Sequence, residues 1–278
     1  MRLFAALFIL ITTTGFSQAI VTPKDAPPFQ REFRSITGIL GAFDEEVRYL
    51  LSITANKTES SIQRISFTQG EINGKKVVIA QTGIGKVNAA IVTQLMIEHF
   101  MPAEIIFTGI AGGLNPGLAP GDLVIGTKVA YHDYGTLTPD SLMRRPTRNP
   151  FTLKDNPVFY NCDPRLIDVA VLAAAEAKFE KLGKRYPTAI KGVIVTGDVF
   201  VASDKAVKDL RKKLNADATE MEGAAVAQVC LQLEQPFVVV RSLSDNAGNA
   251  ASGDVKQFYK LAAMNSASLV IAMVSMIR

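Results

Sequence analysis

The stretch "AEIIFTGIAGG", residues 103–113, decides the fold class of this chain. Its first half, Ala103–Thr108, is apolar almost throughout, which is typical of a strand buried on both faces of a sheet. Its second half, Gly109–Gly113, is rich in glycine and predicts a turn directly after that strand. A buried strand of this kind needs helices on both sides of its sheet, so the stretch predicts an α/β protein.

Segments on either side repeat this alternation of strand and helix. Ile36–Ala42 predicts a strand, residues 44–53 predict a helix, and Thr82–Lys86 opens another helix. Strand-like stretches flank Asn73-Gly74, a strong hairpin signal that makes the sheet mixed rather than purely parallel. Further strands are predicted at 122–130, 190–196 and 237–243, and further helices at 163–181, at 203–214, from within 218–227 to about 233, and from about 255. The predicted fold is therefore a three-layer α/β/α sandwich around a twisted mixed β-sheet.

The first 34 residues do not follow this pattern. Arg2 precedes the apolar run Leu3–Ile11, and small residues at Ser17 and Ala19 fit a signal peptide, residues 1–19, that is cleaved after Ala19. The apolar run is too short for the roughly 20 residues of a membrane-spanning helix. We expect export to the periplasm or the medium without a stable membrane anchor, with residues 20–34 as a leader. Because no repeat or linker follows, residues 35–278 are predicted to form a single domain, whose least regular stretch is 131–162.

The composition excludes some classes of function. The formal net charge is +4, but the 30 basic residues are scattered among 26 acidic ones without a basic stripe, so no nucleic-acid partner is expected. Only two histidines and two cysteines are present, so neither a zinc site of familiar spacing nor a metal cofactor is expected. Whether Cys162 and Cys230 form a disulfide stays open.

Acidic residues in apolar surroundings are the strongest indication of a site. The stretch "ATEMEGAAVA", residues 218–227, places Glu220 and Glu222 among small apolar residues, and Asp245 follows an apolar strand. A carboxylate at a helix N-terminus is worth only ~0.3–1 kcal/mol, which explains one of the first two acids but not all three. Ligands in α/β sheets gather at the carboxyl ends of strands. We therefore expect one crevice formed by Gly109–Gly113, Gly197–Val201, Glu220–Glu222 and Ser244-Asp245. Carboxylates in such a crevice suit a polyhydroxyl ligand.

A set of motifs resembles one enzyme family. "GILGAFDEEV", "TGIGKVNAA", "TGIAGGL", "GDLVIG", "YHD", "VTGDVF", "EMEGAAVAQVC" and "PFVVVRSLSD" are together similar to the 5′-methylthioadenosine/S-adenosylhomocysteine nucleosidases of the purine and uridine phosphorylase superfamily. The resemblance covers residue 36 to the C-terminus except 131–162. It implies a nucleoside phosphorylase-like fold and, without a cofactor, hydrolysis of the N-glycosidic bond of a 5′-substituted adenine nucleoside, with water as the second substrate.

The resemblance also implies roles for individual residues. Asp245 would be the general acid that protonates adenine N7, and Glu46 the base that activates water, with Arg241 near that water. Glu222 would hold the ribose hydroxyls. The other residues expected to bind substrate are Met221 against the sugar, Phe200 stacked on adenine, Val201 at the base edge, and Gly112 and Ser244. A homodimer is implied as well, in which a partner segment closes the 5′ side of the pocket.

Two other functions remain open from the sequence. A phosphate-dependent purine nucleoside phosphorylase is one, although Glu46 in the first turn would repel phosphate. A secreted, non-catalytic binding or storage protein of the same superfamily is the other, although Glu46, Glu222 and Asp245 are all present. Ile110 replaces the small hydroxyl residue usual in these nucleosidases, and 131–162 is longer than usual, so the preferred 5′ substituent stays open.

Overall fold

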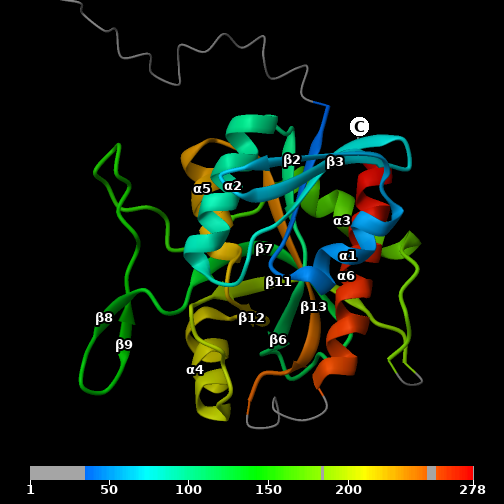
Figure 1. Cartoon of the computed structure of the whole chain (residues 1–278). Helices are drawn as coiled ribbons and strands as arrows, with labels where there is room; N and C mark the ends of the chain where they lie inside the picture. The colour runs from blue at the N-terminus through cyan, green and yellow to red at the C-terminus, as the bar shows by residue number, and fades with distance from the viewer. Residues whose placement is uncertain (1–34, 183–184, 249–254, 278) are drawn as a thin grey trace, which may run out of the picture. The chain divides into compact units, whose positions relative to one another are not determined.

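A single mixed sheet of eleven strands forms the centre of the computed structural model (Figure 1), with the strand order β10-β7-β11-β12-β6-β13-β5-β1-β4-β3-β2. The structure describes residues 35–182, 185–248 and 255–277, so the predicted signal peptide and leader lie outside the described residues. The sheet strands are β1 (Thr37–Gly41), β2 (Ala55–Ile62), β3 (Ile65–Ile72), β4 (Lys75–Gln81), β5 (Glu104–Phe107), β6 (Ile110–Gly113), β7 (Leu123–Tyr131), β10 (Tyr160–Asn161), β11 (Ala189–Thr196), β12 (Ala218–Glu220) and β13 (Phe237–Asn246). A separate hairpin pairs β8 (Gly135–Leu137) with β9 (Leu142–Arg144).

Six helices are described, and they cover the sheet on two sides. They are α1 (Asp44–Ile53), α2 (Lys86–Phe100), α3 (Pro164–Glu176), α4 (Asp204–Leu214), α5 (Gly223–Gln232) and α6 (Val255–Met276). Helices α1 and α3 pack on α6 at one side, while α2 packs on α5 at the other (Figure 1). The three-layer arrangement and the mixed sheet predicted from the sequence are confirmed.

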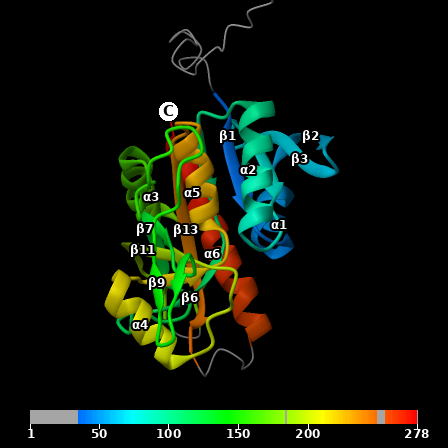
Figure 2. The same cartoon turned by 90° about the vertical axis from the view of Figure 1, so that its left-hand side faces the viewer.

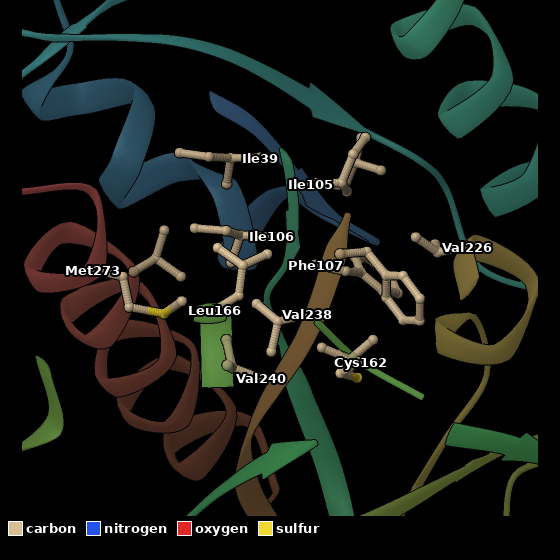
Figure 3. Packing of buried hydrophobic residues seen from close by; sticks show 14 of the residues in the cluster. Ile39, Ile105, Ile106, Phe107, Cys162, Leu166, Val226, Val238, Val240 and Met273 are labelled. Carbon is tan, nitrogen blue, oxygen red and sulfur yellow. The ribbon is translucent and has the colours of Figure 1, made fainter. Parts of the chain in front are cut away.

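Alternating side chains of the central strands fill both layers of the core. On β5, Ile106 points toward Met273 of α6, whereas Phe107 points toward Val226 of α5 (Figure 3). All four side chains are completely buried. The continuous apolar runs of β5 and β13 are thereby explained, because helices cover both faces of these strands.

Strand β13 connects the two halves of the sheet. It pairs in parallel with β5 through Phe237–Val239 and with β6 through Ser242–Asn246, and it pairs antiparallel with β7. The pairings β7–β11, β11–β12, β12–β6, β6–β13 and β13–β7 therefore close one half of the sheet on itself. Figure 2 shows α4 beside this closed half, whereas β2 and β3 form the opposite edge.

Several local predictions are confirmed. The β3–β4 hairpin turns at Asn73 and Gly74, which both have positive φ, the requirement of a type I′ turn. Helix α4 begins at the predicted N-cap Ser203, whose hydroxyl accepts from the backbone N–H of Ala206. Helix α1 spans the predicted residues, with three acids in its first turn and Val47 and Leu50 facing the core.

Other predictions need correction. Residues 109–113 were expected to be a turn, but 110–113 form strand β6, because β12 and β13 flank this segment and supply hydrogen-bonding partners. The helix expected at 163–181 ends at Glu176. Beyond it, the buried Asn265 of α6 accepts from the Glu180 N–H at 2.7 Å and donates to the Glu180 carbonyl at 3.2 Å, so tertiary contacts replace helical ones. The strand expected to end at residue 243 continues to Asn246.

Within the described residues, one helix is long and apolar enough to cross a membrane, namely residues 258–276 of α6. Half of this segment is buried inside the protein, and Ala267, Val270 and Met273 are completely buried. In the structure, α6 is a core helix packed against α1, α3 and β13.

Candidate active site

A cavity of about 600 Å³ lies where the loops after β1 and β4 meet β6, β12, β13 and α6. This volume is typical of a pocket for a small organic ligand. The side chains and backbone that line it are Ala42, Phe43, Glu45, Glu46, Ile84, Ile110, Ala111, Gly112, Phe200, Thr219, Glu220, Met221, Glu222, Ser244, Asp245, Tyr259 and Lys260. Seven of the nine predicted site residues belong to this set, so the structure brings together parts of the chain that are far apart in sequence.

Glu46 enters the cavity from the first turn of α1 and is buried. One carboxylate oxygen accepts from the backbone N–H groups of Ala42 and Phe43, which lead into the helix, and the other accepts from the Ile110 N–H at 2.8 Å. Burial raises the pKa of Glu46 to about 7, although the charge of Arg241 and the three backbone donors lower it. A carboxyl group that titrates near neutrality can act as a general base.

Gly109 makes room for this carboxylate. Its φ is +154°, and a Cβ at this position would collide with the Glu46 side chain. The glycine between β5 and β6 therefore allows the close approach of Glu46 to the backbone of β6.

Asp245 enters the cavity from the opposite strand, β13. The register between β6 and β13 shifts between Leu243 and Asp245, so Ser244 is the extra residue of a bulge, and Asp245 pairs with Gly112. The Ser244 hydroxyl donates to the Asp245 carboxylate at 2.6 Å. Burial raises the pKa of Asp245, whereas this hydrogen bond lowers it. At Gly112 an added Cβ would come within 2.8 Å of the Ala247 Cβ, so a side chain would not fit there.

Glu220 and Glu222 differ in what they contact, although only Met221 separates them. Glu222 is the N-cap of α5, and its carboxylate accepts from the Gly85 N–H at 2.8 Å. Burial and the negative charge of Glu220 raise the pKa of Glu222 to about 8. Glu220 accepts from the Thr196 hydroxyl, from the Gly223 N–H at 2.8 Å and from Arg241.

Arg241 does not line the cavity. Its guanidinium is buried, donates to Glu220 at 2.7 Å, and lies 4.0 Å from the centre of the Phe107 ring. It therefore acts from behind the cavity wall, where its charge lowers the pKa values of Glu46 and Glu222. Its direct partner is Glu220, which the sequence placed in the crevice without an individual role.

The residues predicted to contact the base and the sugar lie at the side of the cavity. Phe200 is 60% exposed and lines the cavity together with Met221. Val201 is buried and lines a smaller adjoining cavity of about 30 Å³, which Phe200 and Asp245 also line. An exposed aromatic ring beside an open cavity is available for stacking on a planar ligand.

Seven lining residues lie outside both the predicted site residues and the predicted crevice, namely Ala42, Phe43, Glu45, Ile84, Thr219, Tyr259 and Lys260. Phe43 and Ile84 lie inside the quoted motifs, so their positions next to Glu46 and Gly85 were the available signal. Tyr259 and Lys260 come from α6, and nothing in the sequence indicates which face of that helix turns toward the cavity. Within the described ranges, no group of three or more His, Cys, Asp and Glu side chains is arranged to hold a metal ion.

The chain is similar to known proteins of one class over most of its length. The family model described as "Phosphorylase superfamily" matches residues 36–275. A curated relative, the 5′-methylthioadenosine/S-adenosylhomocysteine nucleosidase of Halalkalibacterium halodurans, is 41% identical over 239 residues, which cover 85% of this chain and 96% of the relative.

Solved structures of the same class are also similar. A 5′-methylthioadenosine/S-adenosylhomocysteine nucleosidase from Colwellia psychrerythraea in complex with adenine aligns with a TM-score of 0.76 and 35% identity, over 87% of this chain and 95% of that one. The futalosine hydrolase of Helicobacter pylori aligns with a TM-score of 0.75 and 30% identity, over 88% of this chain and 100% of that one. This chain belongs to the 5′-methylthioadenosine/S-adenosylhomocysteine nucleosidase family of the phosphorylase superfamily.

Proposed function

We propose that this protein hydrolyses the N-glycosidic bond of 5′-methylthioadenosine, S-adenosylhomocysteine or a related 5′-substituted adenine nucleoside and releases adenine. The observation that carries this proposal is that Glu46, Glu222 and Asp245, from three separate elements, line one cavity of about 600 Å³. The same observation argues against a non-catalytic role, because burying several carboxylates together lowers stability and is characteristic of functional sites.

The reaction needs charge stabilisation at both ends of the bond that breaks. As the bond from C1′ to the base nitrogen lengthens, its electron pair moves to adenine and positive charge develops on the ribose. Asp245, whose pKa burial raises, transfers its proton to adenine N7. Glu46 takes a proton from the water that attacks C1′, and Glu222 binds the ribose hydroxyls. Both catalytic carboxyls then exchange protons with solvent before the next turnover.

Water rather than phosphate is the proposed nucleophile. Five of the residues that line the cavity are acidic, whereas Lys260 is the only basic residue among the described ones that line it. A phosphate ion near Glu46 would meet like charge, whereas a neutral water molecule would not. A purine nucleoside phosphorylase remains the alternative that the assay must exclude.

The test is release of free adenine from purified protein, followed by chromatography, with and without phosphate and with and without a chelator. We expect equal release from 5′-methylthioadenosine in all four conditions. Activity that requires phosphate would make the protein a phosphorylase, and absence of any base release would favour a binding role.

The 5′ substituent needs a panel of substrates. Phe43, Ile84 and Ile110 are apolar cavity residues that suit a thioether rather than a charged group. We therefore expect 5′-methylthioadenosine to have a higher kcat/KM than adenosine. S-adenosylhomocysteine, 5′-deoxyadenosine and a futalosine-type nucleoside complete the panel, because a futalosine hydrolase is among the similar structures.

We also propose that the protein is a homodimer. Val87 and Ile91 lie four residues apart on α2 and are 69% and 47% exposed, and Ile84, which precedes the helix, is 57% exposed. Such an apolar stripe on a surface helix supports an interface. Light scattering should give the mass of two chains, and Val87→Glu should give one. Leu172→Glu, at an exposed apolar position on α3, is the matched control and should stay dimeric.

Export is the third part of the proposal. It rests on Arg2, the apolar run Leu3–Ile11 and the small residues before position 20. The family match begins at residue 36, so these residues lie outside it. Mass spectrometry of protein from the native cell should show a mature N-terminus at or near Ile20. Chains that begin at Met1 in the cytoplasmic fraction would contradict export.

A further inference from the structure

The N-terminus of α2 is held by carboxylates from two other parts of the chain. The helix lacks a side-chain N-cap of its own, since its N-cap residue is Gly85. The Gly85 N–H donates to Glu222 at 2.8 Å, and the next N–H, of Lys86, donates to Asp198 at 2.9 Å. Gly85 has a φ of +97°, and an added Cβ would come within 3.2 Å of the Asp198 carboxylate. These two backbone N–H groups, of the N-cap and of the first helical residue, have no partner within the helix, so they serve to orient Glu222 and the loop that contains Asp198.

Lys86 is unexpected at this position. It is the first residue of α2, where the helix dipole disfavours a positive charge. Its ammonium group lies 2.7 Å from the Asp133 carboxylate and 3.5 Å from that of Asp198, and the Lys86 and Asp133 side chains are only 22% and 18% exposed. The two carboxylates explain why a lysine is stable there.

Asp133 completes the link between the loops. Its second contact is with the backbone of the β11–α4 loop, because the Asp198 N–H donates to the Asp133 carboxylate at 2.7 Å. Gly197 packs directly on Asp133 and His132, and an added Cβ would collide with both. Three segments, after β4, β7 and β11, are thus joined at one point, and the β11–α4 loop continues to Phe200 in the cavity wall.

We infer that Asp133 and Lys86 are positioning residues, which hold the Gly85 N–H against Glu222 and thereby set how strongly the enzyme recognises the ribose hydroxyls of its substrate. Neither side chain lines the cavity, so their effect passes through the loop 83–86. The inference rests on the proposed role of Glu222 as the residue that binds the sugar.

The consequence is specific to one part of the substrate. If the Gly85–Glu222 hydrogen bond lengthens, Glu222 is less well oriented toward the sugar. The 2′-hydroxyl then adds less to kcat/KM. We therefore compare kcat/KM for 5′-methylthioadenosine with kcat/KM for its 2′-deoxy analogue. In Asp133→Asn this ratio should fall roughly three- to tenfold, which corresponds to the value of one hydrogen bond. Most of the loss for the ribonucleoside should appear as a higher KM.

Several variants separate positioning from a general loss of structure. Lys86→Gln should lower the ratio of the two kcat/KM values as Asp133→Asn does. Lys86→Arg keeps the charge between the two carboxylates and should retain most of the wild-type ratio. The double variant should be no worse than the poorer single variant, because both residues act through one link. Asp209→Asn is the matched control. It breaks an ion pair of 3.3 Å between α4 and Arg144, which donates to the His132 carbonyl, and it should leave the ratio unchanged.

Binding measurements keep the inference testable without turnover. In an Asp245→Asn background, calorimetry should show the same decrease in preference for the ribonucleoside when Asp133 is replaced. A protein that hydrolyses no nucleoside would refute the proposed function, while the binding ratio would still test the positioning. If folded Asp133→Asn and Lys86→Gln variants, checked by melting curves, lose activity equally on both substrates or keep the wild-type ratio, the two residues are structural only.

Discussion

The Nη2 group of Arg241 donates a hydrogen bond of 2.7 Å to Oε2 of Glu220, and both side chains are buried at the wall of the cavity, which Glu220 lines. The guanidinium also donates to the carbonyls of Phe107 and Val240, so most of its polar atoms have partners. The pair connects β13 with β12 next to Glu46 and Glu222, which makes it part of the electrostatic setting of both acids.

Replacing Arg241 with Met should destabilise the protein by about 3–5 kcal/mol, because it leaves the Glu220 carboxylate buried without its cation. Urea denaturation measures the free energy of unfolding. Arg48→Gln is the control, since Arg48 pairs with Asp44 on the exposed surface of α1 and should contribute less than about 1 kcal/mol. Equal losses in the two variants would show that the buried pair does not stabilise the fold.

Glu46→Gln should change how stability depends on pH. The pKa of Glu46 is raised from 4.5 to about 7, so the folded protein binds more protons than the unfolded chain between these values. Its contribution to stability is therefore present below pH 4.5 and is lost as the pH rises through 7. Between pH 5 and 8, the free energy of unfolding of the Gln variant should rise by up to about 3 kcal/mol relative to that of wild type, as measured by urea denaturation. Glu59→Gln, at an exposed position on β2, should show no such gain.

The same titration should appear in catalysis. As the base, Glu46 must be ionised, so kcat/KM of wild type should fall as the pH drops below about 7. Above about pH 7, where Glu46 is ionised in wild type, Glu46→Gln should lose about 10²–10⁴-fold in kcat, and the difference should shrink at lower pH. A Gln variant that retains the wild-type acid limb would assign that limb to another group.

Asp245→Asn should lower kcat at least about a hundredfold, while substrate affinity changes far less, since the amide keeps the shape but has no acidic proton to transfer. Glu222→Gln should instead weaken both affinity and turnover. Ser244→Ala removes a hydrogen bond that lowers the Asp245 pKa, so the alkaline limb of the rate profile should move to higher pH. A folded Asp245→Asn variant with more than about a tenth of wild-type turnover would leave the mechanism without its acid.

Gly109→Ala should displace the Glu46 carboxylate, with which the new methyl group would collide. Because a small displacement of a catalytic group can cost about a hundredfold in rate, we expect a loss of that order in kcat together with a lower melting temperature. Gly74→Ala is the control, for Gly74 has a φ of +73° but no atom within 4 Å of an added Cβ. It should cost only about 1–2 kcal/mol of strain and leave kcat unchanged.

Elements with a strong local signal were predicted correctly. Asn73-Gly74, the Ser203 cap and the acidic start of α1 act through neighbours in the sequence, so they could be recognised without the fold. Strands β2, β6 and β12 were not predicted. All side chains of β2 except two are exposed, and β6 and β12 are only four and three residues long, so partner strands rather than their own residues make them strands.

In the candidate site, too, features with a local sequence signal were predicted and features set by distant parts of the chain were not. Its acids and glycine-rich turns were found because carboxylates among apolar neighbours are unfavourable without a function. The position of Arg241 behind Glu220, the bulge that places Asp245 within β13, and the α6 residues Tyr259 and Lys260 were not found. Each depends on how elements distant in the sequence pack together.

By itself, the sequence determined the α/β class, the mixed sheet, the family and the set of acids that meet at one edge, because periodicity, turn chemistry and motifs are local properties. The tertiary structure decided which of those acids face the cavity, which one is paired, and how their pKa values are shifted. Burial and charge at a group depend on every atom around it, whatever its distance along the chain. Glu220 and Glu222, two residues apart, differ for that reason although both line the cavity: Arg241 pairs with Glu220, while among the described residues the Glu222 carboxylate accepts from the Gly85 N–H alone.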